Sequence, residues 1–259
     1  MSKVTVISCL YDIKRATLGR YSRDFEVYLT YLNNILSLDC NLVLYSDDSR
    51  VIDKVSSLNK PNHIIRNKPF SQLEKYASIQ EIKNVMSSES YIRGLVEPMA
   101  PEYRIPDYSV LINSKIDMMY EEVFANHFGS DVFVWLDSGF RAQLFKQEHI
   151  GRRFPSNNIN SFDLSKFTIL CRSRPQGSDL DIRRFYKSHI NRFGAGVLVG
   201  GANAIKEIKQ KLDIEFDVAL KHNLIDSEQS LLAVAYLKNP ELFNLYDGDW
   251  WSLFDYLIN

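Results

Sequence analysis

Residues 133–139 read Phe-Val-Trp-Leu-Asp-Ser-Gly, so an apolar run ends in a carboxylate at Asp137. Such a run is typical of a buried parallel strand, and Ser138 and Gly139 stop it directly after the carboxylate. Ligands of α/β proteins bind where the strands end, which places Asp137 to meet one. A rigid carboxylate there could bind a divalent cation or a ribose, or it could accept amide hydrogen bonds within the turn.

Residues 194–201 place glycines at both ends of a short apolar strand, at Gly194 and Gly196 and again at Gly200 and Gly201. Glycine lets a bulky ligand approach the backbone, and it also merely permits turns. The segment is not a phosphate loop, because the chain has no Gly-x-x-x-x-Gly-Lys and no Gly-x-Gly-x-x-Gly after its first strand. Both interpretations of the glycines therefore stay open.

A third segment, Asp226-Ser-Glu-Gln229, stands just before an apolar helical run. Asp226 as N-cap with Gln229 three residues later would form a capping box, which is a structural role. Glu228 is then left without a structural role in the first helical turn, where the helix dipole favours an ionised carboxylate. That effect suits a general base only if partial burial offsets it, so a catalytic role for Glu228 or Asp226 stays open beside the structural one.

Basic residues follow three of the expected strands, at Arg15, Arg20 and Arg23, at Arg141, and at Arg172, Arg174, Arg183 and Arg184. A diphosphate needs cations at the carboxyl ends of strands, although a solvated surface is the commoner role of a single arginine. Lys115 lies in an expected helix, from which it could reach a phosphate or face water. Trp250 and Trp251 could stack on a sugar or a base, or pin the C-terminal segment to the core.

A mostly parallel sheet is needed to bring these segments together. The apolar patterns predict strands over 4–10, 41–45, 63–66, 133–137, 167–171 and 196–199. They predict helices over about 22–38, 51–58, 71–95, 108–127, 203–220 and 227–238, and an irregular, proline-containing loop over 97–107. This alternation predicts an α/β fold with a mostly parallel central sheet flanked by helices, formed by one domain over residues 1–259.

The overall composition argues against several classes of protein. Lys and Arg total 31 and Asp and Glu total 32, so the net charge of -1 argues against a nucleic-acid partner. The five histidines lack zinc-site spacing, and the three cysteines are far apart, as in a reducing cytosol. No apolar run approaches the roughly 20 residues of a membrane span. We expect a cytoplasmic protein, and peripheral attachment to the inner face of the cell membrane stays open.

Taken together, five segments resemble the HtrL/YibB-like family, bacterial proteins regarded as glycosyltransferases of lipopolysaccharide and capsule assembly: 6–13, 113–115, 135–139, 194–200 and 226–231. The resemblance implies a GT-A-like nucleotide-diphospho-sugar transferase fold. It also implies transfer of a sugar, expected to be a hexose, from a nucleotide-diphosphate donor that we expect to be UDP-linked. The expected acceptor is a saccharide or a lipid-linked saccharide.

The resemblance also implies roles for individual residues. In GT-A enzymes an Asp-x-Asp holds a divalent metal on the donor, and here Asp137 keeps the first position while Gly139 occupies the second, which puts dependence on Mn²⁺ or Mg²⁺ in doubt. Glu228 and Asp226 match the segment that brings a carboxylate beneath the transferred sugar, as the base of an inverting enzyme, which we favour, or as a stabilising group of a retaining one. The expected donor-binding residues are Leu10, Tyr11, Arg15, Lys115, Trp135, Leu136, Asp137, Ser138, Gly139, Arg174 and Gly196.

Two other functions compete with this hypothesis. A degenerate transferase fold could bind a nucleotide sugar or a glycan without turnover, and Gly139 in place of an acidic residue favours that alternative. A sugar-phosphate nucleotidyltransferase would need a glycine-rich basic loop directly after the first strand. Residues 11–17 contain no glycine, and the first one follows at Gly19, so the nucleotidyltransferase is the weaker alternative.

Overall fold

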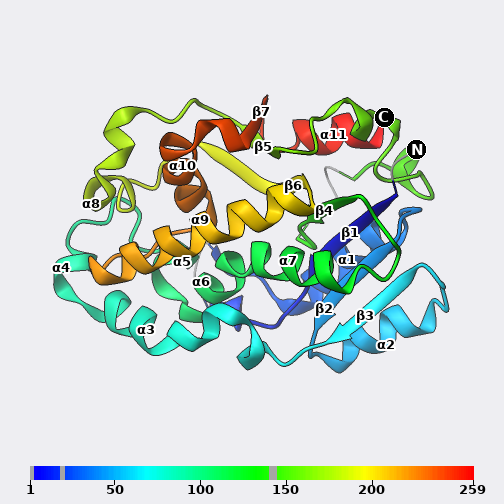
Figure 1. The fold of residues 1–259 in the computed structure, drawn as a ribbon. Helices are drawn as coiled ribbons and strands as arrows, with labels where there is room; N and C mark the ends of the chain where they lie inside the picture. The colour runs from blue at the N-terminus through cyan, green and yellow to red at the C-terminus, as the bar shows by residue number, and fades with distance from the viewer. Residues whose placement is uncertain (1–2, 18–20, 140–144) are drawn as a thin grey trace.

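The computed structural model describes residues 3–17, 21–139 and 145–259 and is built around one seven-stranded sheet (Figure 1). The strands lie in the order β3-β2-β1-β4-β6-β5-β7. Their bounds are Val4–Cys9 (β1), Leu42–Ser46 (β2), His63–Asn67 (β3), Val132–Leu136 (β4), Phe167–Cys171 (β5), Phe193–Gly201 (β6) and Phe243–Asp247 (β7). Neighbouring strands are parallel except at β6, which runs antiparallel to both β4 and β5.

The inner strands are apolar because both faces of the sheet are covered. Every residue of β2, β4 and β5 is buried, whereas the edge strands β3 and β7 are mostly half-exposed. Continuous apolar runs are typical of parallel strands with helices on both faces. Because β1 and β4 are parallel neighbours, their carboxyl ends lie at the same edge of the sheet, and Asp137 directly follows β4.

Helices cover both faces of the sheet, and each side has its own apolar core. One core joins the sheet to α3, α6, α7, α9 and α10, and the other joins it to α1, α2 and α11. The α-helices are Phe25–Leu36 (α1), Ser49–Ser57 (α2), Ile79–Ser87 (α3), Glu89–Ile92 (α4), Pro101–Arg104 (α5), Pro106–Asn113 (α6), Lys115–Ala125 (α7), Ile182–Phe185 (α8), Ala202–Lys221 (α9), Glu228–Lys238 (α10) and Ser252–Ile258 (α11).

Short 3-10 helices occupy several of the connections. They are Arg15–Thr17 (η1), Phe70–Gln72 (η3), Glu74–Ser78 (η4), Gln147–His149 (η5), Asn157–Ser161 (η6), Gly177–Leu180 (η7) and Pro240–Leu242 (η8). The expected α/β fold, with a mostly parallel sheet flanked by helices, is confirmed by the order and directions of the strands.

Several element boundaries differ from the expectation. The helix expected over 108–127 is two helices, because Ser114 (φ −90°, ψ 0°) ends α6 and lets α7 begin at Lys115. The loop expected over 97–107 contains α5 and the start of α6, since Pro101 and Pro106 each occupy the first helical turn, where proline is tolerated. The strand β7 was not expected, because a half-exposed edge strand has no continuous apolar run.

The helices of the described part of the chain are all unsuited to spanning a bilayer. Within residues 3–17, 21–139 and 145–259, no helix combines the necessary length with the necessary apolar character.

Candidate functional site

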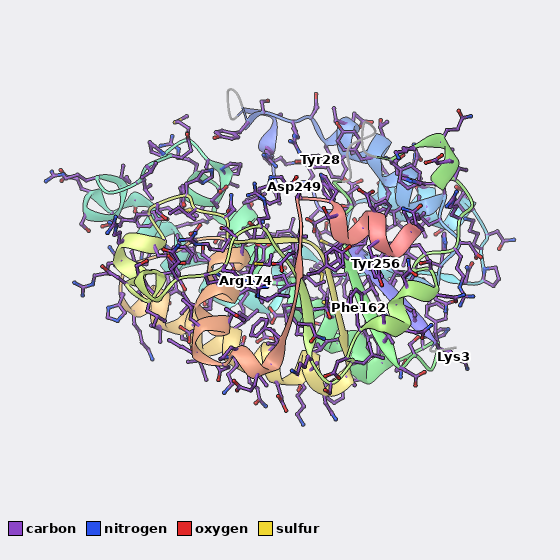
Figure 2. The ribbon with its side chains drawn as sticks, turned by 90° about the horizontal axis from the view of Figure 1, so that it is seen from above. Lys3, Tyr28, Phe162, Arg174, Asp249 and Tyr256 are labelled. Carbon is purple, nitrogen blue, oxygen red and sulfur yellow. The ribbon has the colours of Figure 1, made fainter. Side chains whose placement is uncertain are left out.

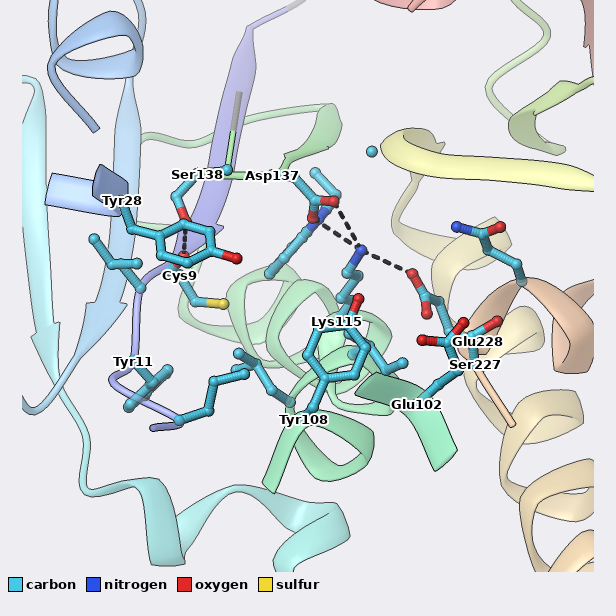
Figure 3. Close-up of a pocket in the computed structure, with 18 of the residues that line it drawn as sticks. Cys9, Tyr11, Tyr28, Glu102, Tyr108, Lys115, Asp137, Ser138, Ser227 and Glu228 are labelled. Carbon is cyan, nitrogen blue, oxygen red and sulfur yellow. Dashed lines mark hydrogen bonds and ion pairs between the residues drawn. The ribbon is translucent and has the colours of Figure 1, made fainter. Parts of the chain in front are cut away.

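A cavity of about 510 Å³ opens at the carboxyl ends of β1 and β4 (Figure 3). Its walls come from the end of β1 and the segment that follows it, from α6 and the first residue of α7, and from the turn after β4. The middle of β6, the start of α10 and the two neighbouring tryptophans complete it. Segments that are far apart in the sequence thus meet at the edge of the sheet where α/β proteins bind ligands.

An ammonium group joins two carboxylates in the wall of this cavity. The Nζ atom of Lys115 lies 2.9 Å from Oδ1 of Asp137 and 2.8 Å from Oε1 of Glu228, and it donates to the carbonyl oxygen of Ala195 at 3.2 Å. Lys115 and Glu228 are almost fully buried, whereas the Asp137 side chain is 32% exposed. Asp137 is therefore the member of this cluster that is most open to a ligand (Figure 3).

Asp137 is held from three directions. The indole Nε1 of Trp135 donates to its Oδ1 at 2.6 Å, Lys115 approaches both carboxylate oxygens, and the backbone N–H of Asp137 donates to Gly196 at 2.9 Å. The Lys115 ammonium also lies 5.8 Å from the centre of the Trp135 ring. A carboxylate bound in this way keeps one orientation at the carboxyl end of β4.

Burial and charge pairing set the protonation of the cluster in opposite directions. Burial by itself lowers the pKa of Lys115, but attraction by Asp137 and Glu228 outweighs it, so the net pKa is raised and the ammonium stays charged. Burial raises the pKa of Glu228, and the nearby Lys115 offsets only part of that rise. A carboxyl group with a raised pKa in a cavity wall is suited to accepting a proton.

Arginine and tyrosine side chains from the segment after β1 form another part of the wall. Arg15 donates from Nη1 to the Tyr28 hydroxyl at 2.8 Å, and its guanidinium lies 5.3 Å from the centre of the Tyr108 ring. Arg23 also lines the cavity, and its backbone N–H bonds to the carbonyl of Arg15. Two arginine residues thus line the cavity, and arginine is a residue that commonly pairs with phosphate.

The structure brings most of the sequence-predicted site residues to this cavity. Those that line it are Leu10, Tyr11, Arg15, Lys115, Trp135, Asp137, Ser138, Gly139, Gly196 and Glu228. Leu136 instead packs into the apolar core on the side of α1. Arg174 lies at the surface, where it pairs with Asp247 of β7 at 2.7 Å (Figure 2). Arg20 and Arg141 lie outside the described residues.

Asp226 is close to the cavity but does not line it. Its carboxylate accepts from the backbone N–H of Ser227 at 2.7 Å and from the Ser230 hydroxyl at 2.6 Å. The expected capping box is wrong, because α10 begins at Glu228 with Ser227 as N-cap. Burial raises the pKa of Asp226 to about 7, against the hydrogen bonds from Ser230 and Ser227 that lower it. Its contacts support the start of α10, and its role as a base stays a prediction.

Glu102 is a cavity residue that the sequence analysis did not identify. It comes from α5 and lines the cavity together with Ser227 and Glu228 (Figure 3). One of its oxygens is 3.2 Å from Nδ1 of His189, a residue with the left-handed backbone angle φ of 54°. The hydrogen bond to Glu102 outweighs burial and raises the pKa of His189. No motif marks Glu102, since it stands in a proline-containing segment that was expected to be irregular.

The glycines of β6 make room for protein groups. A Cβ atom at Gly196 would lie 3.0 Å from a ring carbon of Trp251, and one at Gly201 would lie 2.6 Å from the carbonyl oxygen of Leu164. Gly196 therefore lets the Trp251 ring pack against the strand in the cavity wall. This close approach of protein groups differs from the turn-forming role, and because Gly196 also lines the cavity, the approach of a ligand to it stays a prediction.

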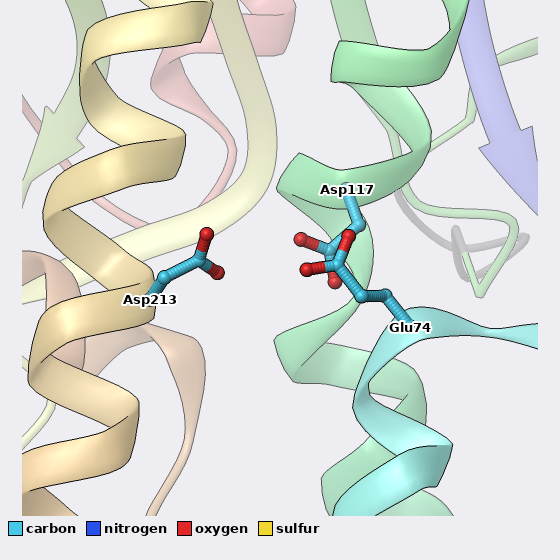
Figure 4. Close-up of side chains that lie close together, drawn as sticks. All are labelled: Glu74, Asp117 and Asp213. Atoms are coloured by element: carbon cyan, nitrogen blue, oxygen red, sulfur yellow. The ribbon is translucent and has the colours of Figure 1, made fainter.

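A group of acidic residues outside the cavity could hold a metal ion by spacing alone. Oxygen atoms of Glu74, Asp117 and Asp213 lie within 4.8 Å of one another, between η4, α7 and α9 (Figure 4). Two ammonium groups already lie among them: Lys209 is 2.7, 3.2 and 2.6 Å from the three carboxylates, and Lys75 pairs with Asp117 and Asp213. This group thus forms an internal ion-pair network that joins the three elements.

Comparisons with known proteins extend over nearly the whole chain. Residues 2–258 match the model of the HtrL_YibB family, described as a bacterial protein of unknown function. Protein HtrL of Escherichia coli (strain K12) is 24% identical over 275 residues, which cover 98% of this chain and 92% of that protein. The crystal structure of mouse xyloside xylosyltransferase 1 in its apo form matches with a TM-score of 0.44 and 11% identity, over 99% of this chain and 91% of that one.

Proposed function

The chain belongs to the HtrL_YibB family of bacterial proteins, and we propose that it is a glycosyltransferase that takes a sugar from a nucleotide-diphosphate donor. The observation that carries this proposal is the composition of one cavity. Its wall combines two arginines, Arg15 and Arg23, with the ammonium–carboxylate cluster of Lys115, Asp137 and Glu228. A nucleotide sugar offers the matching chemistry, because it is anionic at the diphosphate and rich in hydroxyl groups at the sugar.

The size and lining of the cavity support a ligand of this kind. Its volume of about 510 Å³ lies within the range of roughly 300–1,000 Å³ typical of small-molecule sites. Arg15 and Arg23 would neutralise the diphosphate, and the exposed face of Asp137 would accept hydrogen bonds from ribose or sugar hydroxyls. Tyr108 and Trp251 add aromatic surface for a ring. We propose a UDP-linked hexose as donor and a saccharide or lipid-linked saccharide of the bacterial surface as acceptor.

The proposed reaction is a displacement at the anomeric carbon with inversion of its configuration. An acceptor hydroxyl oxygen forms the new bond to this carbon while the bond from the carbon to the diphosphate oxygen breaks. The electron pair of the broken bond leaves with the nucleoside diphosphate, whose charge Arg15 and Arg23 stabilise. Glu228 accepts the proton of the acceptor hydroxyl, a role to which its raised pKa is suited.

Two observations favour a second function, a nucleotide-sugar-binding protein without turnover. Gly139 stands where an acidic residue would be expected, and the ion pair of Glu228 with Lys115 competes with its use as a base. The two functions share the donor site and differ only in whether the bond from the anomeric carbon to the diphosphate oxygen is broken.

The experiment that tests the proposal measures binding and turnover separately. Thermal unfolding is followed with UDP, GDP, CDP and their sugar conjugates, and nucleoside diphosphate release is measured for each donor that raises the unfolding temperature. A ligand that binds only the native state at 100 times its dissociation constant adds about 2.7 kcal/mol of stability. We expect one donor to stabilise the protein and to be consumed.

Variants then assign the chemistry. Glu228→Gln should lose turnover and keep donor binding, whereas the matched control Glu207→Gln, on the exposed side of α9, should change neither. Stabilisation of the wild type without turnover would support the binding protein instead. If no nucleotide or nucleotide sugar stabilises the wild type, the proposed donor site is wrong.

A further inference from the structure

The residues around Asp137 do not fit a divalent cation, although a GT-A-like fold implies one there. Mg²⁺ and Mn²⁺ prefer several oxygen ligands, with carboxylates among them. Here Gly139 replaces the second acidic residue, and Oδ1 of Asp137 already accepts from Trp135 at 2.6 Å and pairs with Lys115 at 2.9 Å. The other carboxylate of the cluster, Glu228, is bound to the same ammonium.

Lys115 itself occupies the place of a cation between these carboxylates. An ammonium group has three N–H donors. Lys115 directs them to Asp137 and Glu228 (Figure 3) and to the carbonyl oxygen of Ala195. Its side chain is 8% exposed, so water does not screen these contacts well. A divalent ion that approached Asp137 closely would be repelled by this buried positive charge.

We propose that Lys115 is a built-in replacement for the divalent cation, so that donor binding does not require a metal ion at Asp137. The inference rests on the proposed function. Lys115 holds Asp137 and Glu228 in one geometry and supplies positive charge beside the sugar end of the donor, while Arg15 and Arg23 neutralise the diphosphate. It follows that removal of the ammonium leaves two carboxylates and a carbonyl oxygen around an empty position, which is a set of ligands that Mn²⁺ prefers.

Manganese titration followed by electron paramagnetic resonance tests this inference directly. The wild type and Asp137→Asn should bind Mn²⁺ equally, because Lys115 keeps the ion away from Asp137. Lys115→Met should gain at least one Mn²⁺ bound more than tenfold more tightly, and the double variant Lys115→Met/Asp137→Asn should lose it. Any manganese bound by Glu74, Asp117 and Asp213 is common to all four proteins and cancels in the comparison.

Calorimetry on the wild type alone provides a second measurement, which does not depend on the folding of Lys115→Met. The affinity for the donor found in the thermal screen should agree within twofold in EDTA and in millimolar MnCl₂. Donor binding that is more than tenfold tighter with manganese, or wild-type Mn²⁺ binding that Asp137→Asn removes, would overturn the inference. If no nucleotide binds in either buffer, the proposed function fails, and the resonance titration still decides whether Lys115 excludes the metal.

Discussion

Replacement of Lys115 by methionine should destabilise the protein strongly, because it removes the ammonium group that pairs with the buried Glu228 carboxylate. Methionine keeps a similar length and apolar stem but has no charge. Glu228 is 4% exposed in its side chain and pairs with Lys115 at 2.8 Å, so the variant buries an uncompensated carboxylate. Breaking a buried ion pair in this way costs about 3–5 kcal/mol, and we expect the free energy of unfolding to fall by that amount at pH 8.

The assay is urea unfolding followed by circular dichroism, and a second substitution tests the cause. Lys115→Met/Glu228→Gln removes both charges and should recover at least half of the loss. Lowering the pH should also restore stability to Lys115→Met, because protonation neutralises the buried Glu228. A loss below about 1 kcal/mol in Lys115→Met, or no recovery in the double variant, would refute the claim that Lys115 compensates the buried charge.

Three further predictions follow from other contacts of the site. Asp226 has a pKa of about 7 in the fold against an ordinary 3.8, so the protein loses stability as the pH rises from about 3.8 to 7. The loss is on the order of 2–4 kcal/mol. Asp226→Asn should remove it, as measured by unfolding at pH 4 and pH 8. An unchanged pH dependence would contradict it. Gly196→Ala should cost about 1–3 kcal/mol and alter tryptophan fluorescence, because the new Cβ would lie 3.0 Å from Trp251, and an unaltered variant would disprove that crowding. In Glu102→Gln the pKa of His189 should fall, which NMR would follow. The variant should also lose stability below pH 6.5, where the charged form of His189 is favoured. An unchanged pKa of His189 would exclude the ion pair of Glu102 with His189.

The parts of the site that could be predicted from the sequence depend on local patterns. The run that ends at Asp137 marks a buried strand and its carboxyl end, because a strand covered on both faces must be apolar throughout. The apolar pattern after Asp226 likewise marks the start of a helix near Glu228. These signals place each residue at an element terminus, and termini of parallel strands meet at one edge of the sheet.

These patterns could not predict which side chains contact one another. Arg174 follows a strand as the predicted phosphate ligands do, yet it turns to Asp247 at the surface. Glu102 reaches the cavity from a short helix whose prolines gave no periodic signal. In both cases the direction of the side chain depends on neighbouring elements and on the path of the connecting segment, neither of which is coded in spacing along the chain.

The apolar periods of the sequence determined the fold class and the edge of the sheet that carries Asp137, because burial imposes these periods locally. The family followed from the similarity of the sequence to its relatives. Only the tertiary structure decided that Lys115 lies between Asp137, 22 residues away, and Glu228, 113 residues away. That contact requires the break at Ser114, the antiparallel insertion of β6 and the docking of α10 against it. Charge pairing between distant residues is set by how whole elements pack, and packing is a property of the folded chain.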